Sequence, residues 1–248
     1  MALRWMILCF LLTATASMAQ ALDPRNILFI GDSHATQTFG LTMDKQLRAH
    51  YGDATVLSYA SCGSRASSWL NDHRTHCGYR HILPGGEGHE TRRYPTPRMA
   101  DLLSKYRPAI TIVSLGANHM GQSQERFVGE VRALALLIRD GGSQCLWVGP
   151  PPCRGNPHPR GLSRAGIQDL LSIVLADLCT VIDSSHYVRY PSSGGDGIHF
   201  DGAYAHGVPR GRSLARQWAR GVFNAAVPLL DLAVHGYTNL ENPAITAP

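Results

Sequence analysis

Five short apolar segments alternate with five segments of helical periodicity along this chain. The apolar segments, each followed by a turn residue, are residues 26–30, 55–59, 109–115, 145–148 and 179–182. Runs of Val, Ile and Leu without alternating polar positions are typical of strands buried on both faces of a parallel sheet. The helical segments, with apolar residues at intervals of three and four, are residues 36–50, 97–106, 124–139, 163–177 and 211–230. The alternation predicts a three-layer α/β/α domain around a central five-stranded parallel sheet.

Residues 1–21 have the layout of a secretory signal peptide. Arg4 precedes an apolar run over residues 5–12, and small residues follow with a small-x-small cleavage site. The run is shorter than the roughly 20 apolar residues that a membrane-spanning helix needs. We therefore expect an exported protein, secreted or periplasmic, without a membrane span. Its single domain occupies residues 22–230, and a loosely packed tail follows over residues 231–248.

Export changes how the six cysteines are interpreted, because one leaves with the signal peptide and five remain. Paired thiols form disulfides by default in an oxidising compartment. We predict one disulfide between Cys62 and Cys77, which closes a short loop. We predict a second between Cys145 and Cys179, because each lies two residues before a similar strand core. Cys153 is then the free thiol.

The charge balance of the chain is basic. It has 23 Lys and Arg residues against 18 Asp and Glu residues, a formal net charge of +5 and a pI near 9.0. The sequence contains no nucleic-acid recognition motif, and an exported protein meets few nucleic acids, so we exclude nucleic acid as a partner. The Arg-rich stretches are either a solvated face or a surface that attracts an anionic polymer such as an envelope glycan.

Residues 71–97 interrupt the alternation. This inserted segment is polar and rich in Gly, His and Arg, and a loop of such length in a compact domain is either a functional lid or disordered. Its potential zinc ligands are His73, His76, Cys77, His81 and His89. Their spacing matches no tight ligand pattern, so we predict no metal site. Tyr79 and Tyr94 are the candidates for an exposed aromatic platform on which a sugar ring stacks.

Residues that can support chemistry follow the predicted strands. In an open parallel sheet, ligands bind in the crevice beyond the carboxyl ends of the strands. Ser33 follows the first strand, Gly63 the second and Asn118 the third. Ser33 offers a hydroxyl, Gly63 an unobstructed backbone N–H and Asn118 a side-chain amide. An alternative for Ser33, or for its neighbour Asp32, is simply to cap the helix that follows.

These groups fit the requirements of acyl transfer by a serine. Such a reaction needs a base, a group that orients the base and donors for the oxyanion. Asp196 and His199 stand three residues apart near the C-terminus, so one turn can present both side chains together. A second Asp-x-x-His sequence, Asp183 to His186, competes for the same role.

Four segments resemble the sequence blocks of the SGNH (GDSL-type) hydrolase superfamily. In chain order they are Gly31-Asp32-Ser33, Gly63, Gly116-Ala117-Asn118 and Asp196-Gly197-Ile198-His199. The resemblance covers nearly the whole chain after the signal peptide, and it implies a flavodoxin-like sheet and no cofactor. It implies Ser33 as nucleophile, His199 as base and Asp196 as the acid that orients the base. It also implies an oxyanion hole formed by the Ser33 and Gly63 N–H groups and the Asn118 side chain.

Two departures from the family pattern bear on the substrate and the direction of reaction. The first block continues as Gly-Asp-Ser-His-Ala, which looks like the SGNH domains that are attached to, or work with, membrane O-acyltransferases. His119 stands where many members carry Asp. Asp32, His34 and His119 are therefore added to Tyr79 and Tyr94 as candidate substrate-binding residues.

The expected function is a secreted serine esterase that removes an acyl group, foremost acetyl, from a carbohydrate or glycan. Two alternatives remain open. One is an O-acetyltransferase that uses the same triad to pass the acetyl group to a glycan hydroxyl. The other is a glycan-binding module with little turnover. The sequence does not specify an oligomeric state.

Overall fold

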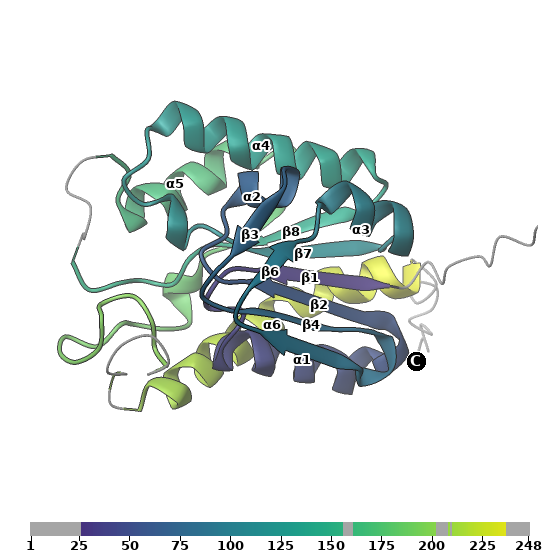
Figure 1. The fold of residues 1–248 in the computed structure, drawn as a ribbon, viewed down its shortest axis with the longest axis horizontal. Coiled ribbons are helices and arrows are strands. Elements are labelled where there is room, and N and C mark those ends of the chain that lie inside the picture. The colour runs from purple at the N-terminus through teal and green to yellow at the C-terminus, as the bar shows by residue number, and fades with distance from the viewer. Residues whose placement is uncertain (1–25, 156–160, 202–207, 209, 237–248) are drawn as a thin grey trace, which may run out of the picture.

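The computed structural model describes residues 26–155, 161–201, 208 and 210–236 (Figure 1). The predicted signal peptide, residues 1–21, lies outside this range, as does residue 237 onward. A seven-stranded sheet forms the centre, in the order β5-β4-β2-β1-β7-β8-β9. The three-layer α/β/α class is therefore confirmed, whereas the expected strand number of five is corrected to seven.

The five predicted strands are all present and all parallel. They are β1 Ile27–Gly31, β2 Val56–Ser61, β7 Ile110–Ser114, β8 Gln144–Val148 and β9 Thr180–Ile182. Every residue of β1, β2 and β7 is buried, which explains why these segments lack alternating polar positions. Gly31 pairs with Ala60 of β2 and with Ser114 of β7, so these three strands end nearly level. The turns that follow them meet at one edge of the sheet.

The segment over residues 71–97 is a set of strands, so the expectation of an inserted loop is wrong. Its strands are β3 His73–Thr75, β4 Tyr79–Ile82, β5 Gly88–Thr91 and β6 Tyr94–Thr96. β4 and β5 extend the main sheet as antiparallel strands beyond β2, while β3 and β6 form a separate two-stranded sheet. β5 is an edge strand and is almost wholly exposed, so its polar residues reflect solvation rather than the absence of structure.

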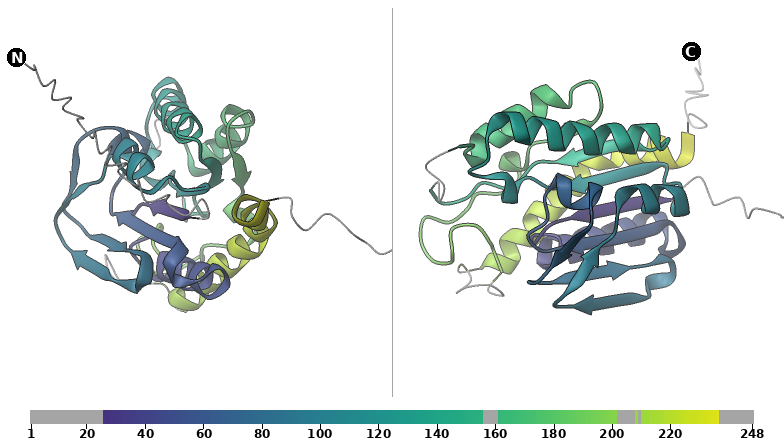
Figure 2. Two further views of the ribbon diagram at one scale, coloured as in Figure 1. Left: turned by 90° about the vertical axis from the view of Figure 1, so that its right-hand side faces the viewer. Right: turned by 45° about the horizontal axis from the view of Figure 1, so that its top comes forward.

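Helices cover both faces of the sheet (Figures 1 and 2). Their bounds are α1 Thr38–Tyr51, α2 Ala66–Leu70, α3 Met99–Tyr106, α4 Gln124–Asp140, α5 Arg164–Val174 and α6 Gly211–His235. α1 and α6 pack on one face around Phe39 and Trp218. α2 to α5 pack on the other face, where Phe127 and Trp147 are buried. The five predicted helices are confirmed, and α2 is an addition.

The last helix is longer than expected. α6 runs to His235, so residues 231–235 are helical rather than the start of a loose tail. Leu230 and Val234 are both buried and continue the apolar stripe that faces the sheet. Short 3-10 turns lie at Asp53–Thr55, Pro84–Gly86, Ala117–His119 and Ser184–His186.

Both predicted disulfides are present. Cys62 is bonded to Cys77, and Cys145 to Cys179, while Cys153 is a free thiol. The first disulfide fastens the turn after β2 to the segment that leads into β4. Among the described residues, no helix has the length and apolar character needed to cross a bilayer. The two disulfides are consistent with an extracellular or periplasmic protein.

Candidate active site

The turn that carries Ser33 begins where β1 ends at Gly31. A Cβ atom on Gly31 would lie 2.4 Å from the Cβ atom of Ala35, so only glycine allows the chain to turn so closely there. The Asp32 carboxylate accepts a hydrogen bond from the His34 N–H at 3.0 Å, and the Asp32 carbonyl accepts from the Ala35 and Thr36 N–H groups. These bonds fix the turn and leave the Ser33 hydroxyl at the carboxyl edge of the sheet.

Ser33 and Asp32 do not cap the helix that follows. α1 begins only at Thr38, and its N-cap residue is Gln37. The Thr38 N–H donates instead to the carboxylate of Asp201, a residue far along the chain, at 2.8 Å. The capping alternative is therefore wrong, and the Ser33 side chain is left for another role.

Ser33, His199 and Asp196 form a continuous chain of hydrogen bonds. The distance from His199 Nε2 to Ser33 Oγ is 2.9 Å, and from His199 Nδ1 to Asp196 Oδ2 it is 2.6 Å. The other oxygen of Asp196 accepts from the Ile198 and His199 N–H groups at 2.8 and 2.7 Å. One carboxylate therefore holds both the imidazole and the turn that carries it. The Tyr190 hydroxyl supports this turn by donating to the His199 carbonyl at 3.0 Å.

Hydrogen bonds stabilise the negative charge of the Asp196 carboxylate. Partial burial alone would raise the pKa of this carboxyl group, but the hydrogen bonds from the His199 ring and from the two N–H groups lower it below its ordinary value. Asp196 is therefore ionised at neutral pH. An ionised partner fixes the tautomer with the proton on Nδ1 and leaves Nε2 able to accept the Ser33 proton.

The competing Asp183 and His186 pair has no such geometry. Their closest atoms, His186 Nε2 and Asp183 Oδ2, are 3.8 Å apart, and the His186 side chain is 73% exposed. Asp183 instead accepts from the Ser185 N–H at 2.8 Å at the start of a 3-10 turn. No serine hydroxyl bonds to His186 among the described residues. The geometry favours the Asp196 pair as the partners of Ser33.

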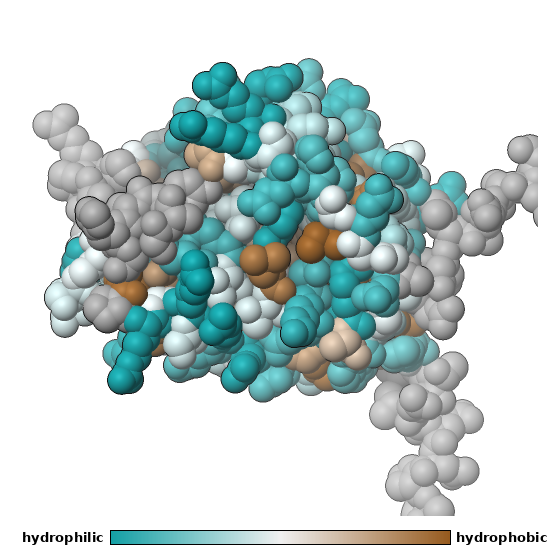
Figure 3. All heavy atoms as spheres, turned by 60° about the horizontal axis from the view of Figure 1, so that its bottom comes forward, coloured by the Kyte–Doolittle hydropathy of each residue, from teal (hydrophilic) through white to brown (hydrophobic). Residues whose placement is uncertain are grey.

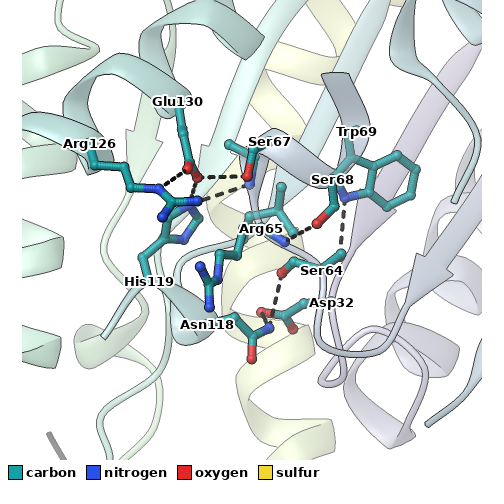
Figure 4. A network of polar contacts seen from close by, with 12 residues as sticks. Asp32, Ser64, Arg65, Ser67, Ser68, Trp69, Asn118, His119, Arg126 and Glu130 are labelled. Carbon is teal, nitrogen blue, oxygen red and sulfur yellow. Dashed lines mark hydrogen bonds and ion pairs between the residues drawn. The ribbon is translucent and has the colours of Figure 1, made fainter. Parts of the chain in front are cut away.

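The three expected oxyanion donors lie in the turns after β1, β2 and β7. Gly63 has a φ of +76°, in the left-handed region that favours glycine. Among the described residues, neither the Ser33 N–H nor the Gly63 N–H has a hydrogen-bond acceptor, so both remain available. The Asn118 amide donates to the Ser64 carbonyl at 3.0 Å and to the Asp32 carboxylate at 3.4 Å (Figure 4). Asn118 would have to give up its longer bond to Asp32 in order to serve an oxyanion.

Two buried residues flank Ser33 in the nucleophile turn. Asp32 is 2% exposed, and burial raises its pKa to about 6 although the His34 N–H and the positive charge of Arg164 lower it. The His34 ring lies 5.2 Å from the His199 ring and packs edge-on against Trp218. Burial and neighbouring positive charge lower the pKa of His34, so it is neutral. The neutral His34 ring thus lies beside the His199 ring and packs against Trp218.

His119 is completely buried behind Asn118, so its expected role as a substrate contact is wrong (Figure 4). Burial lowers the pKa of His119 to about 4, and its Nε2 atom accepts from the Ala66 N–H at 3.4 Å. Glu130 lies 3.6 Å from the same atom and also accepts from Arg126 and Ser67, at 2.7 and 2.9 Å. This network joins α2 and α4 to the turn that carries Asn118.

Tyr79 and Tyr94 differ in exposure. Tyr79 is only 1% exposed, because the Tyr94 ring stacks on it at a centroid distance of 4.3 Å. The expected exposed platform is therefore wrong for Tyr79, whereas Tyr94 is 36% exposed. Among the described residues, no cluster of three or more His, Cys, Asp or Glu side chains could hold a metal ion. Cys77, one of the potential zinc ligands, is bonded to Cys62.

Sequence reasoning missed several residues that shape this site. Asp201 caps α1 from a distance, Tyr190 holds the His199 turn, and Glu130 joins the network behind Asn118. Arg164, the first residue of α5, is buried close enough to Asp32 to affect its pKa. None of these residues belongs to a motif, so no local pattern could have indicated them.

Comparisons with known proteins relate this geometry to solved structures, although no protein-family model and no curated protein matches the chain. TesA is 17% identical, with a TM-score of 0.56 over 82% of this chain and 99% of TesA. An inhibitor-bound aryl esterase from M. smegmatis is 15% identical, with a TM-score of 0.53 over 82% and 99% of the two chains. The psychrotrophic esterase EstA from Pseudoalteromonas sp. is 13% identical, with a TM-score of 0.52 over 82% and 99%. The chain shares the fold of these three solved proteins, two of which are esterases.

Proposed function

We propose that the protein is an exported serine esterase that hydrolyses a carboxylic ester through Ser33. The observation that carries this proposal is the chain of hydrogen bonds from Ser33 through His199 to Asp196. Nucleophile, base and orienting acid in this order are what acyl transfer by a serine requires. The available N–H groups of Ser33 and Gly63 add support, because the reaction develops negative charge on a carbonyl oxygen.

The proposed reaction has two halves. Ser33 Oγ attacks the ester carbonyl while His199 Nε2 accepts its proton, and Asp196 stabilises the imidazolium that results. The oxyanion is held by the N–H groups of Ser33 and Gly63 and by the Asn118 amide. His199 returns the proton to the leaving alcohol, which departs and leaves an acyl group on Ser33. Water then attacks this ester with His199 again as base, and the carboxylic acid and free Ser33 are released.

The proposed substrate is an acylated carbohydrate, with acetyl as the foremost acyl group. The surface beside α1 and the antiparallel edge of the sheet is mostly hydrophilic, and its hydrophobic residues form small separate patches (Figure 3). Within the described part of the chain, the exposed large hydrophobic side chains are Leu41, Tyr94 and Ile173. A lipid substrate would be better served by a broad apolar surface near the nucleophile. Export through residues 1–21 and a single domain from residue 22 are parts of the same proposal.

The direct test is covalent labelling of the nucleophile. A phosphonate ester that mimics the tetrahedral intermediate is expected to add to Ser33 and to abolish hydrolysis of p-nitrophenyl acetate in proportion to the labelled fraction. Peptide mass spectrometry locates the label. Ser33→Ala should take up no label, whereas Ser172→Ala, an exposed serine on α5, should be labelled like the wild type. A label on another residue, or hydrolysis that survives complete labelling, would reject Ser33 as the nucleophile.

A further inference from the structure

A cavity of about 440 Å³ lies between the turns after β8 and β9 and the first turns of α5. Its lining includes Pro150, Pro152, Cys153, Arg164, Gln168 and Asp183. The turn after β8, which lines the cavity, contacts the turn that carries Asp196 and His199, because the Arg154 N–H donates to the Gly197 carbonyl at 2.8 Å. The cavity is therefore adjacent to the site where the ester would react.

Arg164 is a buried cation with no ion-pair partner among the described residues. It is 7% exposed, and none of its three guanidinium nitrogen atoms makes a well-formed hydrogen bond within the described part of the chain. Burial lowers the pKa of Arg164, and the nearby Cys153 thiol and Asp32 carboxylate only partly offset that effect. A buried guanidinium normally has hydrogen-bond partners, because leaving it unpaired costs several kcal/mol. Contacts among the described residues therefore do not explain why an arginine is buried at this position.

Gln168, one helical turn further along α5, also has a buried polar side chain without hydrogen-bond partners among the described residues. Both its Nε2 and its Oε1 atoms are of this kind. Residues four apart lie on the same face of a helix, so Arg164 and Gln168 face the cavity together. A Cβ atom at position 149 would lie 1.7 Å from Gln168 Oε1, so Gly149 is what leaves room for this amide.

The nearby acids do not neutralise Arg164. The Asp32 carboxylate bonds to the His34 N–H and to the Asn118 amide. Asp183 accepts from the Ser185 N–H. Asp169, which also lines the cavity, is exposed to solvent. Among the described residues, the groups in the cavity that lack a hydrogen-bond partner are thus the planar guanidinium donors of Arg164 and the amide nitrogen and oxygen of Gln168.

We propose that this cavity binds the carboxylate of an acidic sugar whose ester Ser33 hydrolyses. A carboxylate matches the guanidinium plane with two parallel hydrogen bonds. Gln168 adds an acceptor for a neighbouring sugar hydroxyl and a donor for an oxygen atom of the ligand. The inference rests on the proposed esterase function and names its substrate class: an acylated uronic acid unit rather than a neutral sugar.

The test compares two esters that differ only in the carboxylate: mono-O-acetylated glucuronate and the same ester of glucose. We expect kcat/KM of the wild type to be at least tenfold higher for the glucuronate ester than for the glucose ester, because only the glucuronate complex contains a charge-assisted pair with Arg164. Arg164→Met, which removes the charge at similar length, should reduce the preference to within about twofold. Arg132→Met is the matched control, because Arg132 pairs with Asp177 on the surface away from the cavity. It should keep the wild-type preference.

A second measurement does not depend on catalysis. Binding of glucuronate and of glucose to Ser33→Ala is measured by titration calorimetry, and only glucuronate is expected to bind. If no ester is hydrolysed but glucuronate binds and Arg164→Met abolishes binding, the esterase proposal fails and the carboxylate site stands. If the wild type treats both esters alike and glucuronate does not bind, the carboxylate site is rejected. The preference of the wild type between the two esters and the binding of glucuronate to Ser33→Ala decide whether the carboxylate site exists even if Arg164→Met does not fold.

Discussion

Replacing His199 with alanine is expected to lower kcat/KM for p-nitrophenyl acetate by about 10⁴-fold, as is usual when a triad base is removed. His199 is the group within 2.9 Å of the Ser33 hydroxyl, so its loss leaves the proton of Ser33 without an acceptor. The chain contains its own control. His186 occupies the same place in a second Asp-x-x-His sequence, but it is exposed, and no serine hydroxyl bonds to it among the described residues. His186→Ala should therefore keep activity within about twofold of the wild type.

Both variants are measured under one set of conditions, with thermal unfolding to establish that each is folded. His199 is partly buried and contacts His34, so a modest loss of stability is expected for His199→Ala. Asp196→Asn adds a second readout, because it keeps the shape of the side chain but reverses the preferred tautomer of the imidazole. Full activity in His199→Ala, or loss of activity confined to His186→Ala, would transfer the role of base to the other pair.

Much of the fold could be predicted because the parallel strands are buried on both faces. A strand such as β1 has room only for apolar residues, so its sequence differs sharply from that of a loop. The antiparallel strand β5 forms the edge of the sheet and is almost wholly exposed, and β4 beside it is only half buried. Their polar residues resemble those of a loop, and only their pairing, β4 with β2 and β5 with β4, distinguishes them. Edge strands of this kind carry little local signal.

The site could be predicted in part for a similar reason. Asp196 and His199 are neighbours in one turn, so their spacing already indicates that they can bond to each other. The order of the blocks along the chain then indicated Ser33. Arg164 and Gln168 have no such local partner. Their proposed role follows from buried side-chain atoms that lack hydrogen-bond partners among the described residues. Unpaired buried groups are visible only after packing is known.

The burial of His119 cannot be read from the sequence either. The resemblance to SGNH hydrolases marked this position as a departure from the family, which suggested contact with substrate. The structure has the ring completely buried against Phe127 and beside Glu130. His119 therefore acts on Asn118 only through the backbone of the turn that they share. The titration of His119, and that of Asp32 in the turn after β1, should be measurable as pH-dependent changes in the free energy of unfolding.

Asp32 and His119 are expected to give stability opposite dependences on pH. The pKa of Asp32 is raised from 3.8 to about 6 in the folded protein, so the folded state binds the proton more tightly and this carboxyl group adds stability as pH falls through 6. The pKa of His119 is lowered from 6.5 to about 4, so the unfolded state binds the proton more tightly and stability is lost as pH falls below 6.5. In the wild type the two effects largely cancel between pH 4 and 6.

Single substitutions should separate the two effects. His119→Gln keeps an acceptor near the Ala66 N–H but cannot titrate, so on going from pH 7 to pH 4 it should gain about 2 to 3 kcal/mol of unfolding free energy relative to the wild type. Asp32→Asn should lose about the same amount relative to the wild type over the same range. Urea unfolding at several pH values measures both differences, and every other titrating group cancels in the comparison with the wild type. A difference from the wild type that stays constant with pH would mean that the substituted residue titrates alike in the folded and unfolded states.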